Sequence, residues 1–256
     1  MAVTASAAQR VRKPYQVSPI FYHIVRLIVA GIMHVLFRYR VHGRQNVPPS
    51  GPAILAVNHL HFIDPGAVAP AIRRQLVTLA ADKWQTDRFT NIFLHIAGVI
   101  YVRRGEVDRQ ALRDCLEVLA SGWLLAMAPE GTRSKTGGLQ QGRAGVAYLA
   151  SKANVPIVPL AFWGTERVRE WKLFKRPRCE VTIGEPFYLP TYEGKPPTEV
   201  LDHWADLVML KIGLMLPPSY RGIYAERIAA IERGESHELD GLRPALSATT
   251  GRRERA

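Results

Sequence analysis

Short apolar segments alternate with helix-like segments through most of this chain, and this alternation constrains the fold more than any other feature. The apolar runs are four to six residues long and are bounded by turn residues or by segments with helical spacing. We expect strands at 53–57, 76–80, 99–102, 123–127, 157–162 and 179–183, and helices after Pro65 and at 90–97, 108–119 and 144–153. Strands that alternate with helices favour an α/β fold. The prediction is a mixed, mostly parallel sheet flanked by helices.

The alternating region also sets the expected domain limits. The chain has 256 residues and 47% hydrophobic content, which is enough for one sizeable core. Pro196 opens a further helical pattern that runs to about Leu216, whereas residues 233–256 are polar and are predicted to be disordered. We therefore expect one central domain at 41–216, between an N-terminal segment at 1–40 and a partly disordered extension at 217–256.

The N-terminal segment contains a strongly apolar stretch at 20–37. A helix here is amphipathic, because its basic side chains share one stripe: His23, Arg26, His34 and Arg38. A spanning helix would place Arg26 in hydrocarbon at a cost of about 2.5–3.5 kcal/mol. A helix that lies in the membrane interface avoids this cost and still buries its apolar face. We expect an interface helix within 1–40, and the alternative is a helix packed on the protein's own core. No small-residue cleavage site follows the stretch, so a signal peptide is not expected.

A histidine and a carboxylate follow the first predicted strand of the alternating region. The segment reads Asn58-His59-Leu60-His61-Phe62-Ile63-Asp64-Pro65. A histidine removes a proton from an alcohol when a carboxylate orients its ring by accepting from the other ring nitrogen. Asp64 is placed to orient His59 in this way. The structural alternative is that Asp64 is the N-cap of a helix that begins at Pro65, and the two roles are compatible.

A second polar segment follows the strand predicted at 123–127. It reads Pro129-Glu130-Gly131-Thr132-Arg133-Ser134, so a turn with a glycine is followed by an arginine. Backbone amides in such a turn and a guanidinium group both bind anions. The two segments together predict a base beside an anion site.

Other chemistries fit the residues less well. His59, His61 and Asp64 invite a metal site, but the pattern His-x-His-x-Asp-His fails, because Ile63 stands at its Asp position. Residues 137–144 approximate a P-loop without its lysine and hydroxyl residue, and no Gly-x-Ser-x-Gly motif supplies a serine nucleophile.

The charge of the chain favours an anionic partner. It has 34 basic and 22 acidic residues and a formal net charge of +12. The arginines fall within the α/β blocks and lack the aromatic platforms of single-strand binders, so nucleic acid is not the expected partner. Two cysteines, Cys115 and Cys179, do not suggest a disulfide framework and favour a reducing, cytosolic setting.

Four blocks in one order resemble the motifs of the glycerolipid acyltransferases, specifically the bacterial 1-acylglycerol-3-phosphate acyltransferase branch. Asn58, His59 and Asp64 match the first motif, and the segment 98–105, with Arg104, is similar to the second. Residues 130–134 match the third motif letter for letter, and 155–160 with Gly164-Thr165 matches the fourth.

The chain departs from the family pattern at three places. His61 stands where serine is frequent, Ala128 where phenylalanine is frequent, and Gly142-Arg143 where Phe-Lys is usual. These departures leave the chemistry in place and put the acceptor and acyl preference in doubt.

The resemblance implies a role for each matching residue. His59 is expected to be the catalytic base and Asp64 its orienting group, with Asn58 and Glu130 as structural support for the turns. The acceptor phosphate is expected to bind to Arg104, Gly131, Thr132 and Arg133. The acyl chain is expected to lie against a wall formed by Val155, Pro156, Ile157, Val158 and Pro159. No metal and no cofactor are required, because a thioester is already activated.

The resemblance also implies partners and a location. An acyl group is expected to move from acyl-CoA or acyl carrier protein, as co-substrate, to a lysophospholipid, most simply lysophosphatidic acid, in phospholipid biosynthesis. The catalytic domain would be 41–216, on the cytoplasmic face of the cell membrane, with a phospholipid surface as partner. The alternatives are an acyltransferase or transacylase for another lysolipid or an aminolipid, and a lipid-binding protein without activity.

Overall fold

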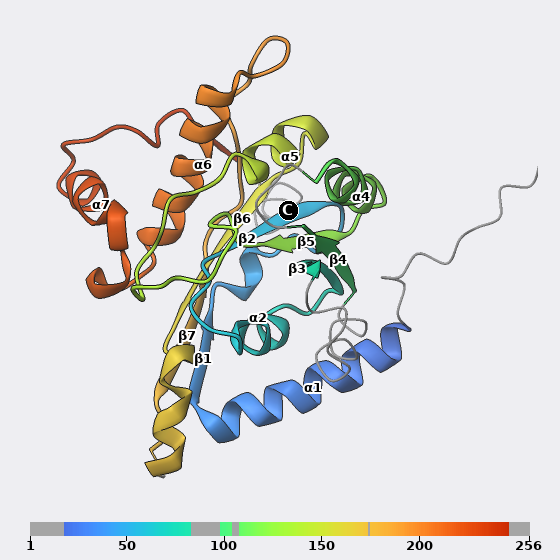
Figure 1. The fold of residues 1–256 in the computed structure, drawn as a ribbon, viewed down its shortest axis with the longest axis vertical. Helices are drawn as coiled ribbons and strands as arrows, with labels where there is room; N and C mark the ends of the chain where they lie inside the picture. The colour runs from blue at the N-terminus through green and yellow to red at the C-terminus, as the bar shows by residue number, and fades with distance from the viewer. Residues whose placement is uncertain (1–17, 83–97, 104–107, 174, 246–256) are drawn as a thin grey trace, which may run out of the picture.

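One sheet contains all nine strands in the part of the chain that the structure describes, which is residues 18–82, 98–103, 108–173 and 175–245 of a computed structural model (Figure 1). The strand order is β1-β7-β6-β2-β5-β3-β4, and β8 and β9 extend the sheet beside β6. The strands are β1 (Arg38–His42), β2 (Ala53–Val57), β3 (Leu76–Ala81), β4 (Val99–Val102), β5 (Leu124–Met127), β6 (Ile157–Trp163), β7 (Arg178–Ile183), β8 (Phe187–Tyr188) and β9 (Arg243–Pro244).

The strand directions divide the sheet into two groups. β6, β2, β5, β3 and β4 run parallel in that order, so their carboxyl ends lie along one edge. β7 is antiparallel to β6 and parallel to β1, and β8 is antiparallel to both β6 and β9. The predicted α/β fold with a mixed, mostly parallel sheet is confirmed. Ligands of such sheets bind outside the carboxyl ends of the parallel strands.

Helices cover both faces of the sheet, because its central strands are apolar on both sides. In β2, Ile54 and Ala56 face one core and Ala53 and Leu55 face the other, and all four are fully buried. The first core is closed by α4 (Arg109–Ala120), α5 (Gly145–Ala153) and α6 (Thr198–Gly213), and the second by α1 (Pro19–Leu36) and α2 (Asp64–Ala71).

Most predicted elements are confirmed with small shifts at their ends. The strand predicted at 123–127 begins at Leu124, and the helix predicted to reach Leu216 ends at Gly213. Asp108 caps α4 by accepting the amides of Gln110 and Ala111. The helix predicted at 90–97 lies outside the described residues.

Three strands, β1, β8 and β9, were not predicted. The failure to predict β1 has a clear physical reason. Three of its five residues are basic, which hides the strand pattern in the sequence. It is an edge strand, and edge strands carry charges that discourage pairing with other chains.

The residues after α6 fold back on the same domain. Tyr224 and Ile228 are buried in the first core, and Arg227 forms ion pairs with Asp206 and Glu238. β9 lies within the segment predicted to be disordered and pairs with β8. The remaining elements are α7 (Ala225–Glu232) and the 3-10 helices η1 (Arg44–Asn46), η3 (Thr165–Leu173), η4 (Pro218–Tyr220) and η5 (Gly222–Tyr224).

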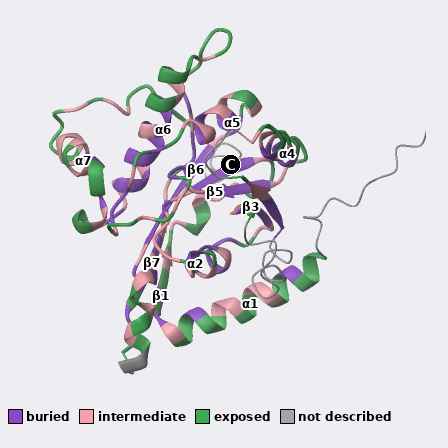
Figure 2. Cartoon of the chain, viewed as in Figure 1, coloured by how far each residue is buried: buried purple, intermediate pink, exposed green. Residues whose placement is uncertain are grey.

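α1 packs on the domain with one side and leaves the other side exposed (Figure 2). Tyr22 and Met33 are buried, and Gly66 of α2 lies beside Met33 and Val29. The apolar face is 46–74% exposed and consists of Ile20, Phe21, Ile24, Leu27, Ile28, Ile32 and Val35. Among the described helices, α1 is the one long and apolar enough to cross a membrane, and 11% of it is buried in the protein.

Candidate active site

β2 delivers Asn58 and His59 to the carboxyl edge of the sheet. The side chain of Asn58 continues the pairing with β6: its amide nitrogen donates to the Phe162 carbonyl (2.8 Å), and its oxygen accepts the Phe162 amide (2.9 Å). Asn58 is fully buried, so both of its polar groups are satisfied by protein. These bonds fix the point at which His59 leaves the sheet.

His59 and Asp64 form a hydrogen-bonded pair. Nδ1 of His59 lies 2.6 Å from Oδ2 of Asp64. A carboxylate only accepts, so Nδ1 carries the hydrogen and Nε2 of the neutral ring keeps its lone pair. The His59 side chain is 23% exposed and that of Asp64 is 5% exposed. The ring therefore reaches solvent while its partner is enclosed, which is the arrangement that a general base requires.

Asp64 is held by three more donors. Its Oδ2 accepts the amides of Leu60 (2.7 Å) and His61 (2.8 Å), and its Oδ1 accepts the hydroxyl of Thr165 (2.7 Å). Asp64 is the first residue of α2, whereas the N-cap is Ile63. The alternative that Asp64 caps the helix is therefore wrong, because its carboxylate bonds the turn before the helix.

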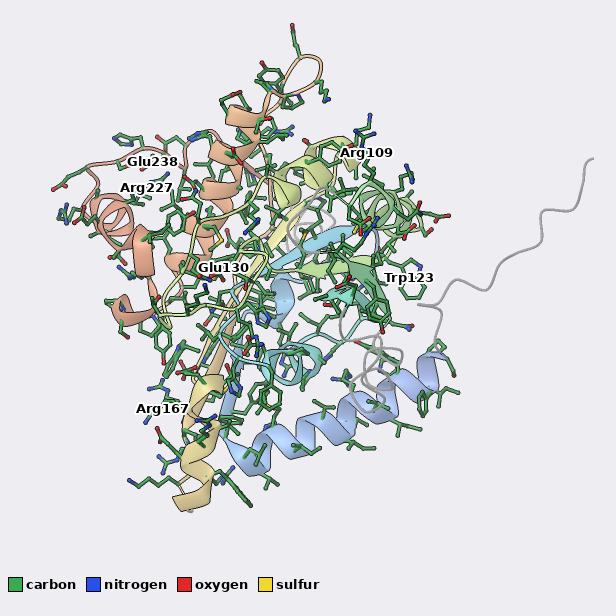
Figure 3. The ribbon with its side chains drawn as sticks, in the orientation of Figure 1. Arg109, Trp123, Glu130, Arg167, Arg227 and Glu238 are labelled. Atoms are coloured by element: carbon green, nitrogen blue, oxygen red, sulfur yellow. The ribbon has the colours of Figure 1, made fainter. Side chains whose placement is uncertain are left out.

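The second polar segment meets the first at the backbone of His59. Oε1 of Glu130 accepts the His59 amide (2.9 Å), and the Ser134 amide donates to the His59 carbonyl (2.7 Å). Oε2 of Glu130 accepts the Gln140 amide (3.0 Å), so the carboxylate bridges two turns near the centre of the molecule (Figure 3). Burial raises the pKa of Glu130, and its hydrogen bonds oppose that shift.

The turn at Gly131 offers part of the predicted anion site. Gly131 has a φ of +69°, which favours glycine, and its amide donates to the Ala128 carbonyl (3.0 Å), so that amide is already used within the turn. Within the described part of the chain, the Thr132 amide has no hydrogen-bond partner, and Arg133 is exposed without an ion pair. Arg133 does not form an ion pair with Glu130, whose carboxylate oxygens accept the amides of His59 and Gln140.

Two further arginines act on this site, one on the turn and one on His61. Nε of Arg143 donates to the Glu130 carbonyl (3.2 Å), and a Cβ at Gly131 would come within 3.0 Å of the Arg143 side chain. Arg169 on η3 acts on His61: burial lowers the pKa of His61, Asp64 opposes the shift, and Arg133 and Arg169 lower it further. In the sequence Arg143 stands out only as a departure from the family pattern, and no local motif marks Arg169 as a residue of this site.

The two polar segments lie in a region that matches a known protein family. The Acyltransferase family model matches residues 38–163, which contain both polar segments. The chain belongs to the acyltransferase family. The matched region of this family begins after α1 and ends at the last residue of β6.

Named relatives and a solved structure agree with this family. The chain is 29% identical over 196 residues to the 1-acyl-sn-glycerol-3-phosphate acyltransferase alpha of Bos taurus, covering 69% of this chain and 63% of that protein. It is 28% identical over 143 residues to the 1-acyl-sn-glycerol-3-phosphate acyltransferase of Borreliella burgdorferi, covering 55% of each. The 1-acyl-sn-glycerophosphate (LPA) acyltransferase PlsC from Thermotoga maritima has a similar fold, with a TM-score of 0.57, 20% identity and coverage of 73% of this chain and 76% of that one. The chain thus spans less than two thirds of the length of the bovine relative.

Some residues assigned from the acyltransferase motifs are not brought together with His59. Val155, Ile157 and Val158 are buried in the two cores, three or more residues upstream of Phe162, which pairs with Asn58. They contribute to packing here, and the acyl-chain wall stays a prediction. Arg104 lies outside the described residues.

The metal alternative has no support in the geometry around His61. Nδ1 of His59 is engaged by Asp64, whose oxygens accept four hydrogen bonds. Nδ1 of His61 is buried and has no hydrogen-bond partner among the described residues. The His61 ring packs on Phe62, with the two ring centroids 4.5 Å apart. In the described ranges, no group of three or more His, Cys, Asp or Glu side chains is arranged to hold a metal ion.

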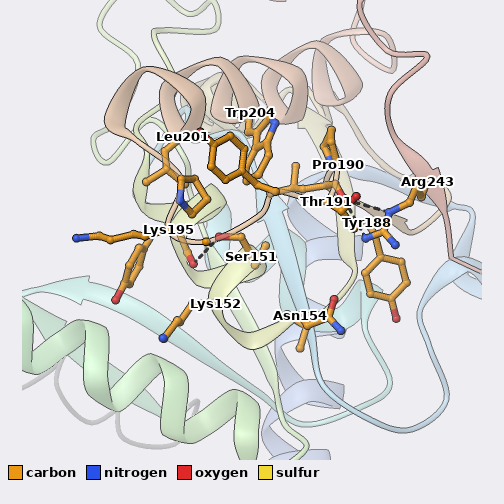
Figure 4. A pocket seen from close by; sticks show the side chains of 17 residues that line it. Ser151, Lys152, Asn154, Tyr188, Pro190, Thr191, Lys195, Leu201, Trp204 and Arg243 are labelled. Carbon is orange, nitrogen blue, oxygen red and sulfur yellow. Dashed lines mark hydrogen bonds between the residues drawn. The ribbon is translucent and has the colours of Figure 1, made fainter.

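A second region of the domain contains a cavity of about 500 Å³, whose lining side chains are drawn in Figure 4. It is lined by the end of α5, β8 and the loop that leads to α6, with Lys152, Lys195 and Trp204 among its residues. The end of α5 precedes the start of β6, which pairs with the start of β2, whereas His59 follows the end of β2. The cavity is therefore at the opposite edge of the sheet from His59.

Proposed function

We propose that this protein transfers a fatty acyl group from a thioester to the free hydroxyl of lysophosphatidic acid. The observation that carries the proposal is the 2.6 Å hydrogen bond between Nδ1 of His59 and Asp64, which leaves Nε2 of a partly exposed ring able to accept a proton. The printed names of the relatives support the choice of acceptor. The donor is acyl-CoA or acyl carrier protein.

His59 acts as the general base in this proposal. Nε2 takes the proton of the acceptor hydroxyl as the oxygen attacks the thioester carbonyl, and the C–S bond then breaks. The leaving thiolate takes up the proton from the imidazolium, so the products are phosphatidic acid and a free thiol. Asp64 keeps the ring in the required tautomer and stabilises its charged form.

The acceptor phosphate binds at the turn beside His59. The free amide of Thr132 and the exposed guanidinium of Arg133 are suited to phosphate oxygens, and Arg143 adds a second positive charge beside Gly131. Arg104 is proposed as a further phosphate ligand from its motif alone. The backbone hydrogen bond from Ser134 to His59 supports a phosphate site at the turn, because it joins the turn directly to the base.

α1 brings the site to its lipid substrates. Its exposed apolar face suits the interface of a bilayer, and its buried side is fixed to α2, whose first residue is Asp64. We propose that the protein works on the cytoplasmic face of the cell membrane.

A thiol-release assay with purified protein tests the proposal. We expect acyl-CoA or acyl carrier protein to be consumed with lysophosphatidic acid, and the phosphatidic acid product to be identified by mass. The matched control is lysophosphatidylcholine, whose phosphate is a diester with one negative charge. A wild-type protein that prefers lysophosphatidylcholine would overturn the assignment of the acceptor, and no thiol release with any lysolipid or aminolipid would favour a lipid-binding protein.

A further inference from the structure

Five basic side chains gather where the connection between β6 and β7 meets the end of α1. They line a cavity of about 510 Å³ together with Glu170, and we call them the cationic cluster: Arg38, Arg167, Lys175, Arg176 and Arg178. The cluster lies outside the turn that holds Gly131. Arg167 marks its position on the segment that projects beyond the C-terminal end of α1 (Figure 3).

The cluster is fixed to the last turn of α1. The guanidinium of Arg176 donates to the carbonyls of His34 and Phe37, and the Arg38 amide donates to the Pro177 carbonyl (2.8 Å). Carbonyls at a helix end lack partners within the helix and carry partial negative charge, so Arg176 stabilises this end. These hydrogen bonds hold the cluster against the C-terminal end of α1.

The cluster has more positive charge than its neighbours neutralise. Arg167 pairs with Glu170 (2.7 Å), and Arg178 pairs with Glu180. Arg38 and Lys175 are exposed, and no carboxylate of the described residues forms an ion pair with either of them. Two cations thus remain available to an external anion.

An exposed apolar surface adjoins these cations. The apolar face of α1 ends at Val35, next to His34, whose carbonyl binds Arg176. Trp171 on η3 is 46% exposed, and tryptophan is enriched at the level of lipid head groups. An anionic membrane surface has an apolar interior, a head-group level and negatively charged phosphates. The apolar face, the indole and the cations match these three parts in turn.

We propose that the cationic cluster binds the phosphates of anionic phospholipids in the same membrane surface that receives the apolar face of α1, with Trp171 at the head-group level. The β6–β7 connection is then a second membrane contact beside α1. This interaction does not depend on the acyl-transfer reaction or on the identity of the acceptor. The continuity of the cations with the apolar face is what favours a lipid surface over an acidic protein.

Vesicle co-sedimentation of the full chain tests the charge. We compare vesicles of phosphatidylcholine with vesicles that also contain phosphatidylglycerol, using the double variant Arg38→Gln with Lys175→Gln. Each cation near an anionic surface contributes about fivefold to the partition constant, so the double variant should lose about twenty-five-fold on the anionic vesicles. Its binding to phosphatidylcholine alone should stay within about twofold, since neutral vesicles lack the surface charge.

The chain offers a matched control. Lys152→Gln with Lys195→Gln removes the same charge from exposed positions at the opposite edge of the sheet. This control should keep its preference for anionic vesicles. Thermal unfolding of both double variants should match the wild type, because none of the four side chains is buried.

Trp171 gives a second, independent measurement. Brominated phosphatidylcholine quenches tryptophan that enters the bilayer, and we expect part of this quenching to disappear in Trp171→Phe but to remain in a Trp123→Phe control. Equal loss of anionic binding in both double variants would overturn the proposal, as would unchanged quenching in Trp171→Phe. So would a cluster that binds acidic acyl carrier protein in solution while the two vesicle types bind equally well.

Discussion

The edge of the sheet at His59 and the outer end of the molecule at α1 use polar and apolar groups in opposite ways. Around His59 the polar groups are enclosed and paired: Asp64 and Glu130 are 3% and 2% exposed and together accept at least six hydrogen bonds. Around α1 the apolar face is exposed, and Arg38 and Lys175 are unpaired among the described residues. The first region fixes geometry within the chain, whereas the second leaves apolar and charged groups open to an external partner.

Removing the base should have the largest effect, because it should abolish most of the activity at His59 and leave the membrane contact at α1 unchanged. General acid–base catalysis contributes about 10²–10⁴-fold, so His59→Ala should lose at least that part of kcat and keep its binding to vesicles. Asp64→Asn should lose much of it, because the amide no longer fixes the tautomer of the ring. Thiol release and vesicle co-sedimentation are measured on the same preparations. Near-normal turnover of His59→Ala would refute the mechanism.

The apolar face of α1 should show the reverse pattern. Ile28 and Val35 are 57% and 61% exposed. Replacing both by serine should weaken binding to vesicles about a hundredfold, since burial of each side chain in lipid contributes roughly 1.5 kcal/mol or more. The unfolding midpoint should change little, because neither side chain packs on the protein. A large fall in the midpoint with normal vesicle binding would mean that this face packs on protein.

Arg133 tests whether the turn binds the acceptor. Arg133→Lys keeps the charge and loses the planar fork, so the KM for lysophosphatidic acid should rise about tenfold, as expected for one lost hydrogen bond to a charged group. The KM for the acyl donor is the internal control and should stay within about twofold. Equal changes in both constants would contradict an acceptor site at this turn.

How much of this site was predictable depends on the sequence distance between its parts. The pairing of His59 with Asp64 could be predicted, because only four residues lie between them. The position of Asp64 within α2 could not, because it depends on the backbone angles of Ile63, which has helical φ and ψ values. The Glu130 bond to the His59 amide joins residues 71 apart and follows from the parallel pairing of β2 with β5.

The same reasoning explains what was missed in the fold and the site. The apolar runs at 53–57 and 157–162 are buried on both sides, so they stand out as strands. β1 alternates buried and exposed residues, and its exposed ones are charged, so its strand pattern is weak. Arg169 lies on η3, more than a hundred residues after His61, and its charge lowers the pKa of His61, an effect that no sequence spacing records.

Thr165 gives the smallest and most specific test of the enclosed network. Gly164 has a φ of +93°, and a Cβ there would lie 2.0 Å from the Arg178 carbonyl, so glycine is required for the turn that delivers Thr165 to Asp64. Thr165 is fully buried, and its hydroxyl donates to Oδ1 of Asp64. The two residues are 101 positions apart in the sequence. Thr165→Val keeps the shape and removes this donor.

We expect Thr165→Val to lower kcat about fivefold to tenfold, corresponding to one buried hydrogen bond of about 1–1.5 kcal/mol, with little change in either KM. Thr165→Ser retains the hydroxyl and should restore most of kcat, which a purely structural role of the threonine methyl group would not allow. Equal losses of unfolding midpoint in both variants, with kcat unchanged, would show that Thr165 serves packing alone and that Asp64 orients His59 without it.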